Sequence, residues 1–114
     1  MLQQASIHFG GENTEQIIIH IALFRWKEGI TRKKIDSAFK QVKQLKEKCD
    51  GIVEVFVGKN YHKESRGFTH GVVVVARDQE SLERYRQHPA HKVIAKDIEE
   101  MEEDSLGFDF KDLR

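Results

Sequence analysis

Two segments of this chain are apolar on both alternating faces, and this pattern limits the folds that the chain can adopt. The first covers residues 17–26 (Ile-Ile-Ile-His-Ile-Ala-Leu-Phe-Arg-Trp), and the second covers residues 68–76 (Phe-Thr-His-Gly-Val-Val-Val-Val-Ala). Such runs of β-branched and aromatic residues are typical of strands that are covered on both sides. With 114 residues the chain has the length of one ordinary domain, so we expect both strands in a single sheet.

A long amphipathic helix is expected between these strands. Thr31 is suited to be its N-cap, and the helix should run to about Lys48, where Asp50 and Gly51 end it. Its apolar residues follow the three-and-four spacing of one buried stripe: Ile35, Ala38, Phe39, Val42 and Leu45. The basic residues 32–34 oppose the helix dipole, so burial of the stripe must hold this helix together.

The remaining elements follow from similar patterns. Alternating apolar residues predict strands over residues 52–58 and 106–110, and a polar connection covers residues 59–67. Asp78 is expected to cap a short helix that runs through Tyr85. Pro89 is suited to the first turn of a further helix that continues to about Glu103.

The predicted order is β-α-β-β-α-α-β, the split βαβ pattern of a ferredoxin-like α+β protomer with a four-stranded antiparallel sheet. In this topology the strands at residues 17–26 and 68–76 are central neighbours, and helices can cover only one face of the sheet. Because both strands are apolar on the second face as well, we expect the sheet of a second copy to cover it. The chain should therefore form a homodimer, a dimeric α/β barrel.

Composition narrows the partners and the location. Nineteen Lys and Arg balance nineteen Asp and Glu, which argues against nucleic acid or an anionic membrane as the main partner. No apolar run approaches the ~20 residues of a membrane span, and the start of the chain lacks the pattern of a signal peptide. We expect residues 1–15 to be a flexible N-terminal extension, residues 16–114 to be the domain, and the protein to be cytoplasmic.

Four of the six histidines occupy unusual positions. His20 and His70 interrupt the two apolar central strands, where they could face the same side of adjacent strands. His88 and His91 flank the start of the last helix and follow Tyr85. Each of these histidines also has a structural interpretation: a hydrogen-bonded core histidine for His20 and His70, a capping residue for His88, and a partly exposed first-turn residue for His91.

The chemistry that these residues favour is acid–base catalysis. The first turn of a helix favours neutral imidazole, so His91 could accept a proton near neutral pH. A metal is not expected, because His-Pro-Ala-His lacks the i and i+4 spacing of a helical histidine pair. The single cysteine, Cys49, can form no internal disulfide, and we find no phosphate or dinucleotide motif and expect no cofactor.

Several motifs together resemble the stress-responsive dimeric α/β-barrel (Dabb) family. They are His-Ile-Ala-Leu-Phe-Arg-Trp-Lys from residue 20, Gly-Phe-Thr-His at 67–70, and Tyr-Arg-Gln-His-Pro-Ala-His at 85–91. The resemblance spans residues 17–110 and implies a ferredoxin-like protomer whose sheet packs on that of a second copy. The family includes plant heat-stable stress proteins, many bacterial proteins without an assigned activity, and olivetolic acid cyclase.

The resemblance to the cyclase implies roles for individual residues. By this similarity His91 is the base, Tyr85 is its hydrogen-bonding partner, and His20 and His70 line the pocket. We also expect His88, Phe24 and Val42 among the substrate-binding residues. Val42 stands where the cyclase carries a pocket tyrosine, so the pocket should differ in shape and polarity, and the polyketide substrate is not carried over.

These features support hypotheses from different classes. In the first, the chain is a noncatalytic, stress-related homodimer that binds a small apolar ligand. In the alternative, it is a cofactor-independent acid–base enzyme that acts on a small carbonyl or phenolic compound. A third hypothesis, a haem-handling protein or a cofactor-free oxygenase, follows from related ferredoxin-like dimers alone. The sequence does not decide whether the protein is an enzyme.

Overall fold

The computed structural model describes residues 16–113. Seven elements follow in the predicted order: β1 (Ile18–Trp26), α1 (Arg32–Lys48), β2 (Ile52–Lys59), β3 (His70–Ala76), α2 (Gln79–Gln87), α3 (Pro89–Met101) and β4 (Glu102–Lys111). The expectation of an N-terminal extension concerns residues 1–15, which lie outside the described residues.

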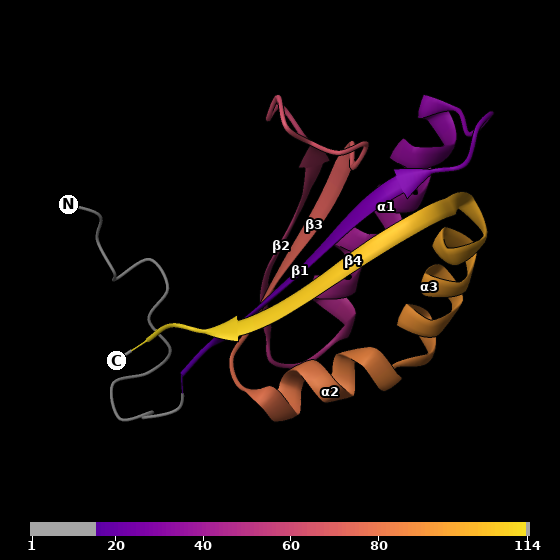
Figure 1. The fold of residues 1–114 in the computed structure, drawn as a ribbon. Helices are drawn as coiled ribbons and strands as arrows, with labels where there is room; N and C mark the ends of the chain where they lie inside the picture. The colour runs from indigo at the N-terminus through magenta and orange to yellow at the C-terminus, as the bar shows by residue number, and fades with distance from the viewer. Residues whose placement is uncertain (1–15, 114) are drawn as a thin grey trace.

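The four strands form one antiparallel sheet in the order β2-β3-β1-β4 (Figure 1). β1 pairs along its whole length with β4, and with β3 up to Phe24, so β1 and β3 are the central neighbours. The predicted ferredoxin-like α+β protomer is confirmed. Within the described residues, no helix is long and apolar enough to cross a membrane.

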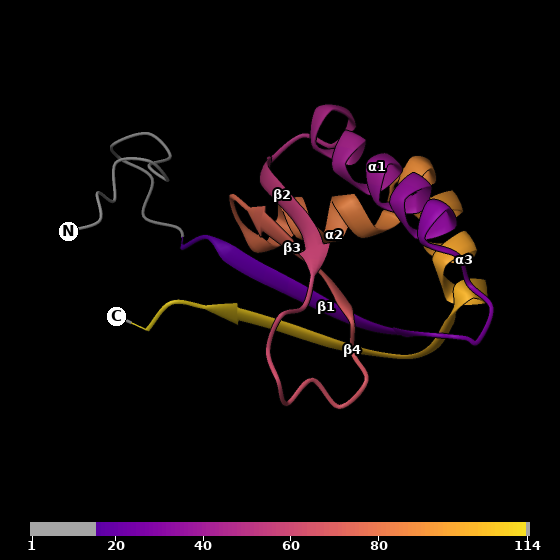
Figure 2. The same cartoon turned by 90° about the horizontal axis from the view of Figure 1, so that it is seen from above.

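All three helices lie on one side of the sheet (Figure 2). The α1 helix begins as predicted, because the Thr31 hydroxyl accepts a hydrogen bond of 3.2 Å from the Lys34 main-chain N–H. Its predicted apolar stripe is buried against the sheet and α3, and the most buried member is Leu45, at 1% exposed. Fully burying a leucine side chain stabilises a fold by about 1.5–3 kcal/mol, which is more than the unfavourable charges at the start of α1 cost.

The opposite side of the sheet is apolar and lacks cover from the described part of the chain. Ile19, Ile21 and Leu23 face this side, and the strand register places Phe110, Phe108 and Leu106 of β4 beside them. The three β4 residues and Phe56 of β2 are between 39% and 61% exposed. The second face that the sequence pattern marked as apolar is therefore an open surface on the protomer.

Two predicted boundaries were wrong. The last helix ends at Met101 rather than Glu103, and β4 begins at Glu102 rather than at residue 106. Acidic side chains such as Glu99 and Glu100 at the end of α3, with no basic residue in its last turn, disfavour a longer helix. From Glu102 onward the main chain instead pairs with the end of β1.

β3 also starts later than predicted, at His70 rather than residue 68. The Asn60 side chain donates a hydrogen bond of 2.7 Å to the Phe68 carbonyl, and the Asn60 main-chain N–H donates one of 2.7 Å to the Thr69 carbonyl. These contacts hold the connection as a closed loop before the strand begins.

The turn between α1 and β2 depends on Gly51. Its φ is +86°, and a Cβ atom added there would lie 2.1 Å from Oγ of Ser81. Ser81 cannot move aside easily, because its hydroxyl and main-chain N–H both donate to the Asp78 carboxylate, at 2.6 and 2.8 Å. Gly51 thus allows the start of α2 to approach this turn closely.

We predict that Gly51→Ala destabilises the protein more than Gly29→Ala does. Both glycines have positive φ, but a Cβ at Gly29 meets nothing within 4 Å. Gly29→Ala should lower the free energy of unfolding by about 1–2 kcal/mol, because alanine is strained at positive φ. Gly51→Ala should lower it by about 3 kcal/mol or more, because the clash with Ser81 adds to this strain. Equal losses of melting temperature for the two variants would contradict this view of the α1–β2 turn.

Candidate active site

A cavity of about 250 Å³ lies between the sheet and the helices. Its walls are mainly apolar and come from all three helices and from β1, β3 and β4. Five of the predicted site residues line it: His20, Phe24, Val42, Tyr85 and His91. Glu99, Glu102 and Ser105 also line it, so the cavity combines apolar walls with a few polar groups, as small-molecule sites commonly do.

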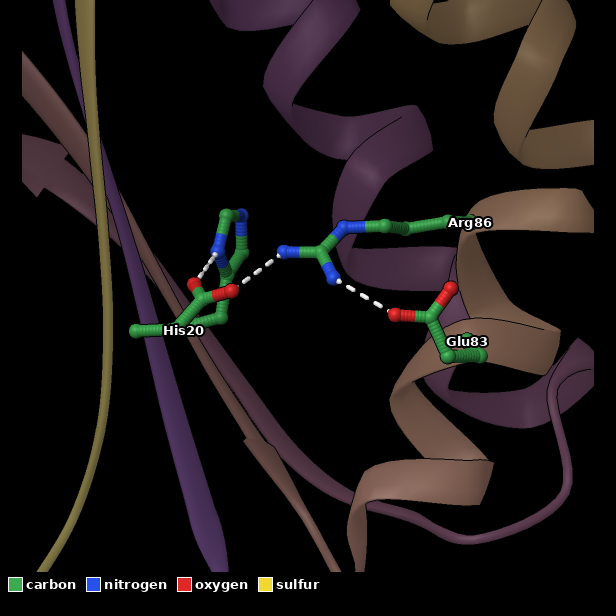
Figure 3. A network of polar contacts seen from close by, with 4 residues as sticks. His20, Glu83 and Arg86 are labelled. Carbon is green, nitrogen blue, oxygen red and sulfur yellow. Dashed lines mark hydrogen bonds and ion pairs between the residues drawn. The ribbon is translucent and has the colours of Figure 1, made fainter.

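His20 is held by an acidic partner on the neighbouring strand. The register places His20 opposite Asp109, and His20 Nδ1 lies 2.6 Å from Asp109 Oδ1. The second carboxylate oxygen accepts a hydrogen bond of 2.6 Å from Arg86, and Arg86 also bonds Glu83 at 3.3 Å (Figure 3). A continuous polar network therefore joins α2, β4 and β1.

The network keeps Asp109 ionised and determines which nitrogen of His20 carries the shared hydrogen. Burial by itself raises the pKa of the Asp109 carboxyl, but hydrogen bonds from Arg86 and His20 outweigh it and hold this pKa below its usual range. An ionised carboxylate can only accept, so His20 Nδ1 carries the hydrogen of this bond. In the neutral ring His20 Nε2 is then an unprotonated acceptor.

Tyr85 and His91 form the second polar pair of the cavity. Their ring centroids are 4.5 Å apart, and the ring planes are inclined by 56°. Tyr85 is only 3% exposed, and burial raises the pKa of its hydroxyl to about 12. The Tyr85 hydroxyl therefore stays protonated around neutral pH and can donate a hydrogen bond within the cavity.

His91 is a neutral imidazole in this environment. Burial is the main cause that lowers its pKa, and the charge of Arg86, with that of His20 and His88 when these rings are protonated, adds to the effect, while a hydrogen bond to the main-chain carbonyl of Arg86 acts in the opposite direction. Its Nδ1 atom is buried and has no hydrogen-bond partner among the described residues. Leaving such an atom unpaired costs about 1–3 kcal/mol, so this position of His91 lowers the free energy of unfolding.

His88 has the capping role that its position before a proline suggested. Its Nδ1 accepts a hydrogen bond of 3.0 Å from the Ala90 main-chain N–H, and Pro89 opens α3 behind it. These two residues fix where α3 starts and thereby place His91 in its first turn. His88 is not among the residues that line this cavity, and its contact with a substrate stays a prediction.

His70 also lies outside the cavity, contrary to the expectation that it lines the same pocket as His20. Both face the helices, but the register pairs His20 with Val74 and His70 with Phe24. Four residues along β1 therefore separate their positions, or about 13 Å. The Nδ1 atom of His70 instead accepts a hydrogen bond of 3.0 Å from the indole N–H of Trp26.

Asp109 is the residue that the sequence analysis missed. It stands between Phe108 and Phe110 in a strand whose apolar residues alternate, so it belongs to the opposite face of that strand. An isolated acidic residue on the face that looks toward the helices was the available signal. To connect Asp109 with His20 from this signal, one would have to know that β4 pairs with β1 and in which register.

No group of three or more His, Cys, Asp or Glu side chains within residues 16–113 is arranged to hold a metal ion. The polar groups of the cavity are two imidazoles, one phenol, one hydroxyl and two carboxylates. What the cavity can do by itself is accept and donate protons and hydrogen bonds.

The fold and this cavity together define a ferredoxin-like protomer with a small internal site between sheet and helices. The sequence profile of the stress responsive A/B barrel domain family (Dabb) matches residues 18–112, and the chain belongs to that family. No curated protein sequence matches the chain.

Solved structures share the fold at low sequence identity. A protein of Arabidopsis thaliana is 24% identical, with a TM-score of 0.79 and 85% of this chain and 96% of that chain covered. A dimeric ferredoxin-like protein of unknown function from Thermobifida fusca is 21% identical, with a TM-score of 0.77 and 91% and 98% covered. A hydroxynitrile lyase from Passiflora edulis is 18% identical, with a TM-score of 0.80 and 87% and 95% covered.

We predict that Asp109 sets the tautomer of His20. In the wild-type protein at pH 8, nitrogen NMR should show a protonated Nδ1 and an unprotonated Nε2. In Asp109→Asn the amide oxygen should stay with Arg86, which can only donate, so the amide NH₂ faces His20 and the ring proton moves to Nε2.

Asp97→Asn, on the exposed face of α3, is the matched control and should leave the tautomer of His20 unchanged. A wild-type ring protonated at Nε2, or an Asp109→Asn variant with the wild-type tautomer, would contradict the assignment.

Proposed function

We propose that this chain is a cofactor-independent acid–base enzyme that acts on a small carbonyl or phenolic compound. The observation that carries the proposal is that His20, Tyr85 and His91 line one mainly apolar cavity although they come from three separate elements. Apolar walls would bind the body of the substrate, and the three polar groups would act on its reactive part.

In this proposal His91 is the base and Tyr85 stabilises the developing negative charge. Because burial lowers the pKa of His91, its ring is unprotonated at neutral pH and can take a proton from a carbon beside a carbonyl. The electron pair left on that carbon moves to the carbonyl oxygen, and the protonated Tyr85 hydroxyl donates to this oxygen. General base assistance of this kind contributes about 10²–10⁴-fold.

His20 supplies the third interaction. In the neutral ring its Nε2 is an acceptor whose direction is held by Asp109 through Nδ1, so it can accept a hydrogen bond from a substrate hydroxyl. A compound that carries both a carbonyl and a hydroxyl group would use all three side chains. Asp109 then acts as a positioning residue, because it reaches the substrate only through His20.

Size and charge limit the substrate further. The cavity of about 250 Å³ has room for about eight water molecules at the ~30 Å³ that each occupies in the liquid, so the substrate is small. Glu99 and Glu102 disfavour a further negative charge in the same cavity. These features support a neutral compound, and the similar fold of a protein named as a hydroxynitrile lyase supports an active site on this fold.

A noncatalytic ligand-binding role is the second candidate. Two of the four unusual histidines already have structural tasks: His70 accepts from Trp26, and His88 caps α3. If His20 and His91 only satisfy buried groups in the same way, removing them should change stability more than chemistry. A stress-related role and a cytoplasmic location stay predictions in either case.

We also propose that the chain forms a homodimer through the open face of its sheet. The exposed apolar residues on that face, Phe56, Leu106, Phe108 and Phe110, would become buried against the same residues of a second copy. The Thermobifida fusca protein, which has a similar fold, is described as dimeric, and this supports the proposal.

The catalytic proposal predicts exchange of carbon-bound hydrogen with solvent. NMR in D₂O should show deuterium entering small neutral hydroxyaryl ketones beside the carbonyl. His91→Ala should slow this exchange by about 10²–10⁴-fold, and Tyr85→Phe by about tenfold or more. The exchange rate should fall only below the usual pH range of histidine, because the lowered pKa of His91 keeps its ring unprotonated through neutral pH.

His62→Ala, in the exposed loop after β2, is the control and should keep the wild-type rate. Catalysed exchange that His91→Ala retains in full would overturn His91 as the base. Ligand binding without any exchange, combined with a lower melting temperature of His91→Ala, would favour the noncatalytic role.

The dimer proposal predicts that Phe108→Asp produces a monomer. Light scattering at micromolar concentration should give twice the chain mass of 13.3 kDa for the wild-type protein and the single chain mass for the variant. Val93→Asp, at an equally exposed apolar residue on α3, should remain dimeric. A wild-type protein that is monomeric at this concentration would refute the proposal.

A further inference from the structure

We propose that a groove between α1 and β2 is a second binding site, and that it takes a small organic anion with an apolar body. The groove has a volume of about 690 Å³ and lies on the helix side of the sheet. It is lined by parts of α1 and β2, by Tyr61 in the loop after β2 and by the first residue of β3, and it shares no lining residue with the cavity described above. The proposal does not depend on the proposed catalytic function.

The base of the groove is apolar. Ile35 and Phe39 of α1 contribute to it, and both are also part of the core, at 6% and 5% exposed. Val57 of β2 adds a half-buried aliphatic side chain. A flat or linear apolar group placed here would lie against side chains that are held in place by the core.

His70 gives this apolar surface one directed hydrogen-bond donor. The Trp26 indole can only donate, so His70 Nδ1 must accept their hydrogen bond, and the ring proton is then on Nε2. Burial lowers the pKa of His70, and the charge of Lys59 adds to this against the opposing effect of Asp36. His70 therefore presents a neutral N–H group at the groove, which it lines.

The groove is also strongly basic for a chain with no net charge. Four cationic residues line it against a single acidic one: Arg32, Lys40, Lys43 and Lys59 against Asp36. Asp36 is already paired with Arg32 at 3.8 Å. The ion pairs among residues 16–113 include none with Lys40, Lys43 or Lys59, although Lys43 lies near enough to Glu54 to lower the pKa of its carboxyl. Lys40 and Lys59, with part of the charge of Lys43, can therefore attract a ligand.

These features together select the class of ligand. An inorganic anion would be attracted by the lysines but would gain nothing from Ile35, Phe39 and Val57. A neutral apolar compound would gain nothing from the lysines. An aromatic or alkyl carboxylate uses both, with its carboxylate near the lysines and the His70 N–H and its apolar body on the base of the groove.

The two sites therefore differ in the sign of the charge that their lining residues carry. The cavity with His91 carries Glu99 and Glu102 and disfavours anions, whereas the groove carries an excess of positive charge. A homodimer through the opposite face of the sheet would leave the groove open. The same protein could then hold an anion and a neutral compound at once.

Trp26 provides the test, because it is the only tryptophan and is bonded to His70. We would titrate the full chain with 4-phenylbutanoate and with its matched neutral analogue 4-phenylbutanamide, and follow Trp26 fluorescence and heat of binding. We expect saturable binding of the carboxylate and at least tenfold weaker binding of the amide. No binding of the carboxylate at millimolar concentration, or equal affinity for both, would overturn the proposal.

Variants locate the site. Lys43→Gln combined with Lys59→Gln should weaken carboxylate binding about tenfold, since each charge near the ligand contributes a few-fold in affinity. Lys33→Gln combined with Lys48→Gln removes the same charge from α1 outside the groove and should change affinity less than twofold. Equal weakening by both pairs would mean that net charge alone attracts the ligand and would contradict a defined site.

His91→Ala separates this site from the catalytic cavity. We expect it to leave carboxylate affinity unchanged, because His91 does not line the groove. Loss of carboxylate binding in His91→Ala would place the anion in the first cavity and overturn the second site. Failure of the hydrogen-exchange assay would leave this result unaffected.

Discussion

The register of β1 is the constraint on which the rest of this structure depends. β1, like β3, has hydrogen-bonded neighbours on both sides, and its alternation decides which of its residues face the helices and which face the open surface. A shift of one residue would move His20 to the open face and Ile19 or Ile21 to the core. The same register brings Asp109 opposite His20 and keeps His70 about 13 Å away along the strand.

His20 and Tyr85 are stable in the cavity because each makes favourable contacts with its neighbours. Asp109 holds His20 by a hydrogen bond of 2.6 Å and is itself held by one of 2.6 Å from Arg86, while Tyr85 gains from burial of its ring against His91. His91 is the exception, since its Nδ1 is buried without a partner among the described residues. A small domain has a free energy of unfolding of only a few kcal/mol, about 5–15, so a destabilising position of this kind is more easily explained by a role in binding than by a role in stability.

Much of the fold could be predicted because the signals were local. The apolar runs of β1 and β3, the buried stripe of α1 and the caps at Thr31 and Asp78 can each be predicted from a few neighbouring residues. The structure has all of them. The end of α3 could not be predicted in the same way. Ile98 and Met101 continue its helical pattern, and only pairing with the end of β1 explains why β4 starts at Glu102.

The site was harder to predict than the fold for a related reason. His20, Tyr85 and His91 could be selected one by one as unusual residues, and the family resemblance suggested their roles. Which of the histidines share a cavity depends on strand register, and the sequence pattern gives only the face and not the position along the strand. For this reason His70 was grouped with His20, and Asp109 was overlooked.

The central claim is that the helix-facing side of β1 forms a real binding cavity with His20, Tyr85 and His91. The most direct test is a crystal structure of the protein soaked with a small neutral hydroxyaryl ketone such as 4-hydroxyacetophenone. The account predicts the ketone in this cavity, with its oxygen atoms within hydrogen-bonding distance of Tyr85 and a histidine. A cavity closed by apolar side chains, or a ketone bound elsewhere while the cavity stays without it, would contradict the account.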